Sequence, residues 1–172
     1  MQSGHSDRAR FILADASVRL PFEDASFDAL SCIDAMNHFT DRLGVLEEWK
    51  RLLRTGGRAI FTDPVVVTGP VTNSELARRS SIGAFLFVPL GVNERRIEKA
   101  GLHLVKQEDV TSNAALIAGR WREARQRHRE ALIRVEGDAR FEGLQNFFET
   151  VHRLAAERRL SRIAYFLEKR RG

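Results

Sequence analysis

The chain has 172 residues, which is enough for one domain of ordinary size with a hydrophobic core of its own. Hydrophobic residues make up 43% and charged residues 30%, so the composition excludes a disordered or fibrous chain. The single cysteine excludes an intramolecular disulfide framework, and no apolar run reaches the length of a membrane span. We therefore expect a cytoplasmic protein.

The formal net charge of +5 raises the question of a nucleic-acid ligand. Most basic residues lie in the second half of the chain, where arginines alternate with glutamates at helical spacings, as in WREARQRHRE and AAERRLSR. Such spacing is typical of solvated helix faces with ion pairs between successive turns. A nucleic-acid groove usually adds a Lys/Arg stripe or exposed aromatic residues. We expect neither a nucleic-acid nor a membrane partner.

The start of the chain predicts two strands and a helix. Residues 11–16 (FILADA) and 27–33 (FDALSCI) are short apolar runs of the kind that form buried parallel strands, and the loop between them contains Pro21. A helix is expected to begin near Asp41, because this residue can cap it and the apolar residues that follow keep a helical period through Leu53. A pair of glycines is expected to end this helix.

The middle of the chain predicts two further strands. Residues 58–64 (RAIFTDP) form the third strand, and residues 65–90 form a lid or insertion, since glycines and prolines interrupt their apolar sequence. Asn93 is expected to cap a helix over residues 94–101. Residues 103–110 (HLVKQEDV) are expected to form the fourth strand.

The end of the chain is mostly helical. Residues 114–135 and 139–158 have amphipathic patterns separated by Gly137, and residues 163–168 predict a last strand. The alternation of strands and helices favours an open α/β sheet in one domain.

Four stretches of this sequence resemble the class I S-adenosylmethionine-dependent methyltransferases, in particular the small-molecule branch that includes the type 11 and ubiquinone-biosynthesis enzymes. These stretches are ADASVRLPFEDASFDAL, CIDAMNHF, EEWKRLLRTGGRAIFTDP and IEKAGLHLVKQEDVT. The resemblance implies a partial Rossmann-like sheet that is mostly parallel with an antiparallel last strand. It also implies a lid over residues 65–90 and inserted helices over 114–158, within a single methyltransferase domain spanning 1–172.

The resemblance implies S-adenosylmethionine as the cofactor, with its adenine at the turn after the first strand. Asp15 matches the acid that accepts a hydrogen bond from the adenine amine, for which a carboxylate is a strong acceptor. Ala16 would offer its backbone N–H to the ring, and Leu20 would belong to an apolar wall. Asp15 could equally cap the turn that follows it, and the sequence leaves this alternative open.

The segment after the second strand is where the resemblance implies the rest of the site. Cys32, Ile33 and Asp34 would lie along the methionine part of the cofactor. Asn37 and His38 would lie where the pocket for the methyl acceptor begins. His38 could orient the acceptor or take its proton, because its neutral imidazole is suited to physiological pH, or it could be a structural histidine.

Methyl transfer needs little acid or base chemistry, because the sulfonium is already an activated electrophile and the enzyme mainly has to hold the acceptor in line and exclude water. Asp63 follows the third strand and could line the pocket for a small-molecule methyl acceptor. The five histidines are scattered without the spacing of zinc ligands, so no metal site is expected.

A glycine-rich E/D-x-G-x-G-x-G turn normally begins this family's fold, and this sequence has only Gly4 before Gly44. Its backbone amides would contact the cofactor. The domain is therefore expected to be N-terminally incomplete. It could be part of a longer methyltransferase, be completed by another copy of itself or a second chain, or be a remnant without catalysis.

Two function classes stay open at this point. In one, the chain is, or derives from, a methyltransferase that acts on a small molecule. In the other, it is a non-catalytic, dimeric interaction or regulatory module. A nicotinamide-dependent dehydrogenase is a third reading of the fold, but such enzymes have no counterpart of the LPFEDASFD stretch.

Overall fold

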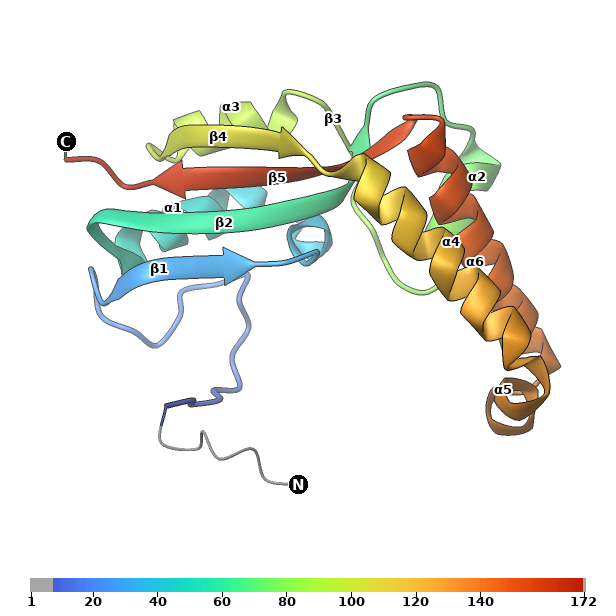
Figure 1. The fold of residues 1–172 in the computed structure, drawn as a ribbon. Coiled ribbons are helices and arrows are strands. Elements are labelled where there is room, and N and C mark those ends of the chain that lie inside the picture. Colours follow the sequence, from blue (N-terminus) through green and yellow to red (C-terminus); the bar gives the residue numbers. More distant parts are fainter. Residues whose placement is uncertain (1–7, 172) are drawn as a thin grey trace.

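One mixed sheet organises the computed structural model, which describes residues 8–171. The strands that form its main path, in spatial order, are β1 (Phe27–Cys32), β2 (Leu53–Val67), β5 (Leu160–Glu168) and β4 (His103–Asp109). β1 and β2 are parallel, whereas β5 is antiparallel to both of its neighbours, β2 and β4. The short β3 (Val88–Pro89) pairs with the end of β2. The predicted mostly parallel sheet with an antiparallel last strand is confirmed (Figure 1).

The hydrophobic core lies on one face of the sheet, under α1 (Arg42–Leu52) and α3 (Val92–Lys99), which Figure 1 shows behind the strands. The predicted cap of α1 is confirmed, because the Asp41 carboxylate accepts a 3.0 Å hydrogen bond from the backbone N–H of Gly44. Trp49 of α1 packs edge-on against Phe61, which in turn stacks on Tyr165 of β5. These aromatic contacts join the helix layer to the centre of the sheet.

A group of helices extends from the end of the sheet where β1 and β2 finish (Figure 1). It consists of α2 (Asn73–Arg79), α4 (Thr111–Arg127), α5 (Arg129–Glu136) and α6 (Asp138–Ala156). The predicted helix over 114–135 is divided at His128, where the backbone leaves helical geometry. A 3-10 turn, η1 (Met36–His38), follows β1 at the same end. No helix in residues 8–171 is both long and apolar enough to cross a membrane.

Two predicted elements are wrong. Residues 11–16 form no strand, and Phe11 and Leu13 are almost fully exposed. A strand needs a neighbour for its backbone hydrogen bonds, and no described residue pairs with this segment. Asn93 does not cap α3; the helix begins after Gly91, whose positive φ of 89° sets the turn, and Asn93 points its side chain into the core.

The boundaries of β2 and β5 also differ from the prediction. β2 begins at Leu53 and continues through the expected glycine turn, because the N–H of Gly56 bonds to the carbonyl of Lys169 and the carbonyl of Gly57 accepts from Lys169 in return. β5 begins at Leu160, three residues earlier than predicted.

A buried ion pair joins four segments at the end of the sheet. Arg42 and Asp63 are 1% and 0% exposed, and their side chains are 2.5 Å apart. Asn93 donates to the same carboxylate at 2.9 Å and accepts from Arg42 at 2.8 Å. Arg42 also donates to the carbonyl of Leu86 at 2.6 Å. This network therefore fixes α1, β2, α3 and the loop before β3 relative to one another.

A second polar cluster attaches α2 to the rest of the protein. Thr72 and Glu75 form a capping box at its first turn. The Glu75 carboxylate also pairs with Arg159 at 2.7 Å and with Arg153 of α6 at 3.0 Å. Hydrogen bonds from Arg159, followed by those from Thr72, lower the pKa of Glu75 to about 2.

We predict that Asp63→Asn lowers the free energy of unfolding by about 3–5 kcal/mol, because it leaves the buried Arg42 charge without a counterion. Urea denaturation measures this difference. Asp28→Asn is the matched control, since Asp28 pairs with Arg54 at the surface and its loss should cost about 1 kcal/mol or less. Equal losses for the two variants would contradict the assigned role of the buried pair.

We predict that Glu75→Gln lowers the urea midpoint at neutral pH, since it removes the charge that holds α2. The lowered pKa means that the carboxylate contributes fully above its ordinary value of 4.5 and loses that contribution as the pH falls toward about 2. The difference in urea midpoint between wild type and Glu75→Gln should therefore become smaller over that pH range. Glu142→Gln, which alters an exposed pair with Arg129, should have almost the same urea midpoint as wild type. A difference in midpoint between wild type and Glu75→Gln that is constant across pH would contradict a role for this ion pair.

Candidate functional site

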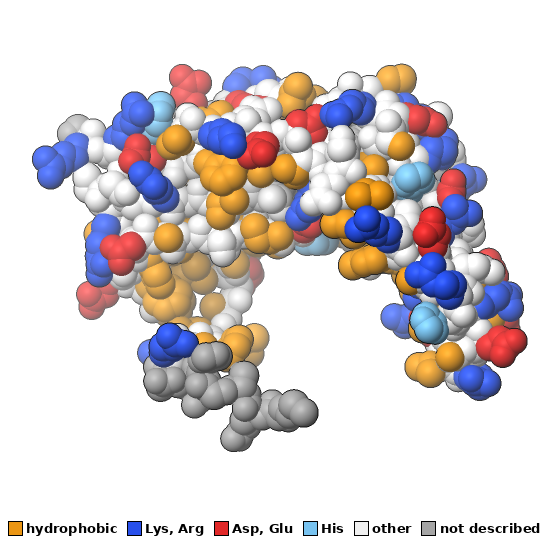
Figure 2. Space-filling model, in the orientation of Figure 1, with side chains coloured by type: hydrophobic (Ala, Val, Ile, Leu, Met, Phe, Trp, Pro, Cys, Tyr) orange, Lys and Arg blue, Asp and Glu red, His pale blue; other side chains and the backbone are white. Residues whose placement is uncertain are grey.

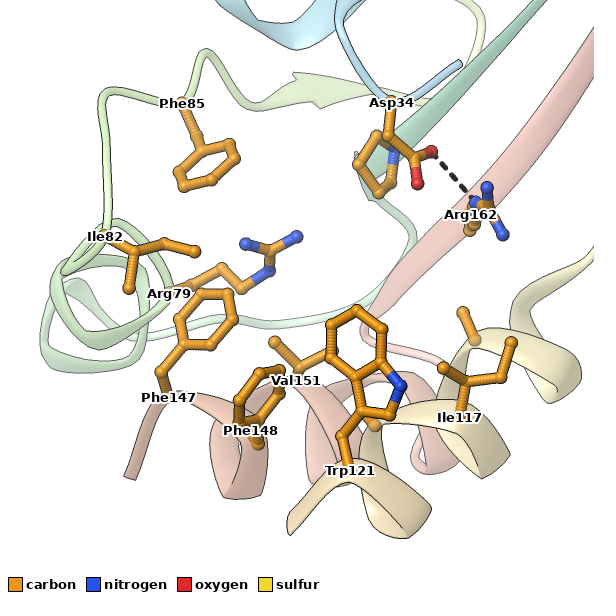
Figure 3. A pocket seen from close by; sticks show the side chains of 13 residues that line it. Asp34, Arg79, Ile82, Phe85, Ile117, Trp121, Phe147, Phe148, Val151 and Arg162 are labelled. Carbon is orange, nitrogen blue, oxygen red and sulfur yellow. Dashed lines mark hydrogen bonds and ion pairs between the residues drawn. The ribbon is translucent and has the colours of Figure 1, made fainter. Parts of the chain in front are cut away.

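A pocket of about 270 Å³ lies between the ends of β1 and β2 and the helices that extend beyond them (Figure 3). Strand ends supply one side of this pocket, and α2, α4, α6 and the loop after α2 supply the other sides. Its lining residues are Asp34, Pro64, Arg79, Ile82, Phe85, Ala114, Ile117, Ala118, Trp121, Phe147, Phe148, Val151 and Arg162. The carboxyl ends of parallel strands are the usual place for ligand sites in α/β sheets.

The helical side of the pocket is apolar and aromatic. Trp121 of α4 packs edge-on against Phe148 of α6, with ring centroids 5.3 Å apart. Phe148 makes a second edge-on contact with Phe147. Trp121 is 58% exposed, so its ring offers contact area to a ligand rather than to the protein core. Figure 2 shows the molecule hollowed on the side where these helices curve away from the sheet.

The strand side of the pocket is polar and is organised around Asp34. This residue has a positive φ of 53°, which is uncommon outside glycine. Its N–H donates to the Thr62 hydroxyl at 2.8 Å, and that hydroxyl donates back to the Asp34 carboxylate at 2.6 Å. Arg162 of β5 donates to the same carboxylate at 2.9 Å. The turn after β1 is thus fixed by side chains from both β2 and β5.

Arg79, the last residue of α2, brings a second guanidinium to the pocket. The residue is 6% exposed, and its charged group lies over the rings of Phe85 and Phe147. Burial lowers the pKa of Arg79 to about 10, so it stays charged at neutral pH.

Asn37 and His38 lie beside this pocket in η1. Asn37 is fully buried, and its side-chain N–H lies 3.3 Å from Nε2 of His38. Nδ1 of His38 lies 2.8 Å from the carbonyl of Ala84, an arrangement in which the ring donates to that carbonyl and accepts from Asn37. His38 also packs against Phe85. These contacts connect η1 to the loop that carries Phe85.

Cys32 and Ile33 precede Asp34 at the end of β1. Cys32 is half-buried, and burial raises the pKa of its thiol, so the neutral thiol predominates. Ile33 is 55% exposed although it is a large apolar residue. The two residues therefore offer mostly apolar surface next to the Asp34 carboxylate.

Asp15, Ala16 and Leu20 are placed away from the pocket lining. Asp15 and Ala16 are exposed, and the Asp15 carboxylate accepts hydrogen bonds from the N–H and hydroxyl of Ser17, which lower its pKa. This is the capping geometry that the sequence left as an alternative. The N–H of Leu20 donates to Glu48 of α1. The structure does not bring these three residues together with Asp34.

Asp63 also lies outside the pocket lining. Its carboxylate accepts from Arg42, Asn93 and the N–H of Val65, and it is fully buried. The neighbouring Pro64 reaches the pocket instead. No group of three or more metal-ligating side chains occurs among residues 8–171.

Sequence reasoning missed Arg79, Trp121 and Arg162. The signal for Arg79 was the T-x-x-E capping box at Thr72, which marks the start of α2 inside a segment predicted only as a lid. Trp121 and Arg162 have no local signal, because their place in the pocket depends on how α4 and β5 meet the end of β1.

Comparisons with known proteins identify relatives of this chain. Residues 2–61 match the family described as methyltransferase domain. The chain is 34% identical over 108 residues to the 27-O-demethylrifamycin SV methyltransferase of Amycolatopsis mediterranei, an alignment that covers 61% of this chain and 39% of that protein. The chain thus spans about two fifths of the length of the curated relatives it first matches.

Solved structures extend the likeness to nearly the whole fold. A protein described as a sarcosine dimethylglycine methyltransferase of Galdieria sulphuraria has a TM-score of 0.85 at 18% identity, covering 97% of this chain and 62% of that one. Phosphoethanolamine N-methyltransferase 2 of Haemonchus contortus, in complex with phosphomonomethylethanolamine and S-adenosylhomocysteine, has a TM-score of 0.81 at 21% identity, covering 91% and 36%. The chain is thus similar in sequence to the methyltransferase domain family over residues 2–61, and similar in fold to these solved structures over nearly all its length.

Proposed function

We propose that this chain forms part of an S-adenosylmethionine-dependent methyltransferase that acts on a small molecule. The observation that carries the proposal is the position of the pocket, which opens where β1 and β2 end, beside the turn held by Asp34 and Thr62. The match of residues 2–61 to a methyltransferase domain supports the same assignment. In this proposal the strand ends contact the cofactor and the pocket receives the methyl acceptor.

The residues after β1 fit the cofactor in chemistry. S-adenosylmethionine, when bound, supplies a methyl group on a positively charged sulfur. Ile33 offers exposed apolar surface for the nucleoside or the methionine chain, and Cys32 is neutral beside it. The Asp34 carboxylate lies at the same turn, where it could accept a hydrogen bond from the cofactor. The predicted cofactor contacts of Asp15, Ala16 and Leu20 stay predictions.

The pocket residues would act by holding and shielding the acceptor. The aromatic side chains of α4 and α6 exclude water from one side, and the helices leave the acceptor facing the strand ends. His38 and Asn37 are proposed to hold the loop at Phe85, one wall of this pocket, through their bonds to Ala84 and to each other. His38 would then position the acceptor pocket rather than transfer a proton.

These 172 residues contain no glycine-rich turn of the kind whose backbone amides would contact the cofactor. We propose that a segment outside them supplies that wall, either in the same polypeptide, in a second copy or in a partner chain. The outer edge of β1, which no described strand covers, is the place where such a segment would pair. We further propose a single domain that works in the cytoplasm, without a nucleic-acid partner.

We predict that S-adenosylhomocysteine binds this chain weakly, in the millimolar range, and that Ile33→Ala weakens binding roughly tenfold by removing apolar contact area. Titration calorimetry measures both. Val105→Ala is the matched control, because Val105 is also 55% exposed but lies on β4, away from the pocket. Equal weakening by both substitutions, or no binding by the wild type, would contradict the proposed cofactor contacts.

A further inference from the structure

The pocket contains a buried cation whose hydrogen-bonding capacity is not fully used. Within the described part of the chain, Nη1 of Arg79 has no hydrogen-bond partner, although the residue is 6% exposed. Figure 3 shows the guanidinium pointing into the pocket, near Phe85 and Phe147. Its carbon lies 4.7 Å and 5.1 Å from the centroids of these two rings. The rings contribute cation–π attraction, but they accept no conventional hydrogen bond, so burial of this donor is only partly compensated.

The charges around the pocket leave Arg79 as the unmatched group. Two arginines and one carboxylate line the pocket in the described residues, namely Arg79, Arg162 and Asp34. Asp34 already accepts from Arg162 at 2.9 Å and from Thr62 at 2.6 Å. The pocket therefore has one net positive charge, and that charge lies at the end formed by α2 and the Phe85 loop.

The rest of the lining selects for an apolar ligand body. Beyond the two arginines and Asp34, every lining side chain is apolar or aromatic. A ligand that fits must therefore combine a hydrophobic body with one group that can accept hydrogen bonds from a guanidinium. A carboxylate meets that requirement best, because its two oxygens match the fork of donors on arginine.

We propose that the ligand of this pocket is an apolar carboxylate, bound with its carboxylate on Arg79 and its hydrophobic body against Trp121 and Phe148. The claim that this ligand is the methyl acceptor rests on the proposed function. The claim that the pocket binds it does not. An ammonium group would be repelled by Arg79, and the two rings nearest that end are already covered by the guanidinium. A neutral ligand would leave the donor without a partner and would gain nothing from the net charge.

The test compares three probes with the same body, phenylpropanoate, phenylpropanol and phenylpropylammonium, without any cofactor. Trp121 fluorescence reports binding, since this side chain lies in the pocket whereas Trp49 is buried in the core. We expect the carboxylate to bind about tenfold more tightly than the alcohol, in line with a charge-assisted hydrogen bond, and the ammonium to bind most weakly.

Arg79→Gln should remove this preference. It should weaken binding of the carboxylate probe about tenfold and change binding of the alcohol probe by no more than about twofold. Retained alcohol binding shows that the variant pocket is intact. Arg78→Gln is the matched control, because Arg78 is the preceding residue of the same helix and is exposed; it should bind all three probes as wild type does. Arg79→Lys should keep part of the preference, since it keeps the charge without the fork.

The proposal is overturned if the alcohol or the ammonium binds wild type as tightly as the carboxylate, if none of the probes binds at millimolar concentration, or if Arg79→Gln retains the preference. The wild-type comparison stands even if the variant does not fold. Because the assay contains no cofactor, failure to bind S-adenosylhomocysteine would count against the proposed function and leave this inference standing.

Discussion

The buried pair between Arg42 and Asp63 is the constraint on which both the fold and the pocket depend. It closes the core at the end of β2 and holds α3 through Asn93. The same arginine binds the carbonyl of Leu86, which fixes the loop that presents Phe85 to the pocket. A charge pair with almost no solvent exposure makes this arrangement specific, because any shift of the loop would leave a buried donor unsatisfied. One wall of the pocket is therefore set by the core.

In the proposed function, the two sides of the pocket would divide the work that methyl transfer requires. The strand side offers a carboxylate and apolar surface at a rigid turn, where Thr62 and Arg162 both hold Asp34. The helical side offers aromatic surface and the buried charge of Arg79. Such an arrangement would hold two molecules next to each other and exclude water between them, which is most of what an activated methyl donor needs from a protein. The arginine would then select the acceptor.

The sequence predicted β1, β2, β4 and β5 because their apolar runs are local patterns, and the resemblance to a known family implied that the last strand is antiparallel. The cap at Asp41 was predictable because it depends only on neighbouring residues. Asn93 was assigned as a cap because its residue type favours that place, but its side chain instead accepts from Arg42 and donates to Asp63 in the core. Arg79 was missed because its burial comes from packing between α2, α6 and a loop, which no local pattern encodes.

Photo-crosslinking of labelled S-adenosylmethionine to the chain tests most directly the claim that the end of β1 contacts the cofactor. Tryptic cleavage after Arg19 and Arg42 releases residues 20–42 as one peptide, which contains the turn at Asp34. The account predicts that the label is recovered in this peptide and that excess S-adenosylhomocysteine prevents its incorporation. Label confined to peptides of α4 to α6, or label that the competitor does not reduce, would contradict it.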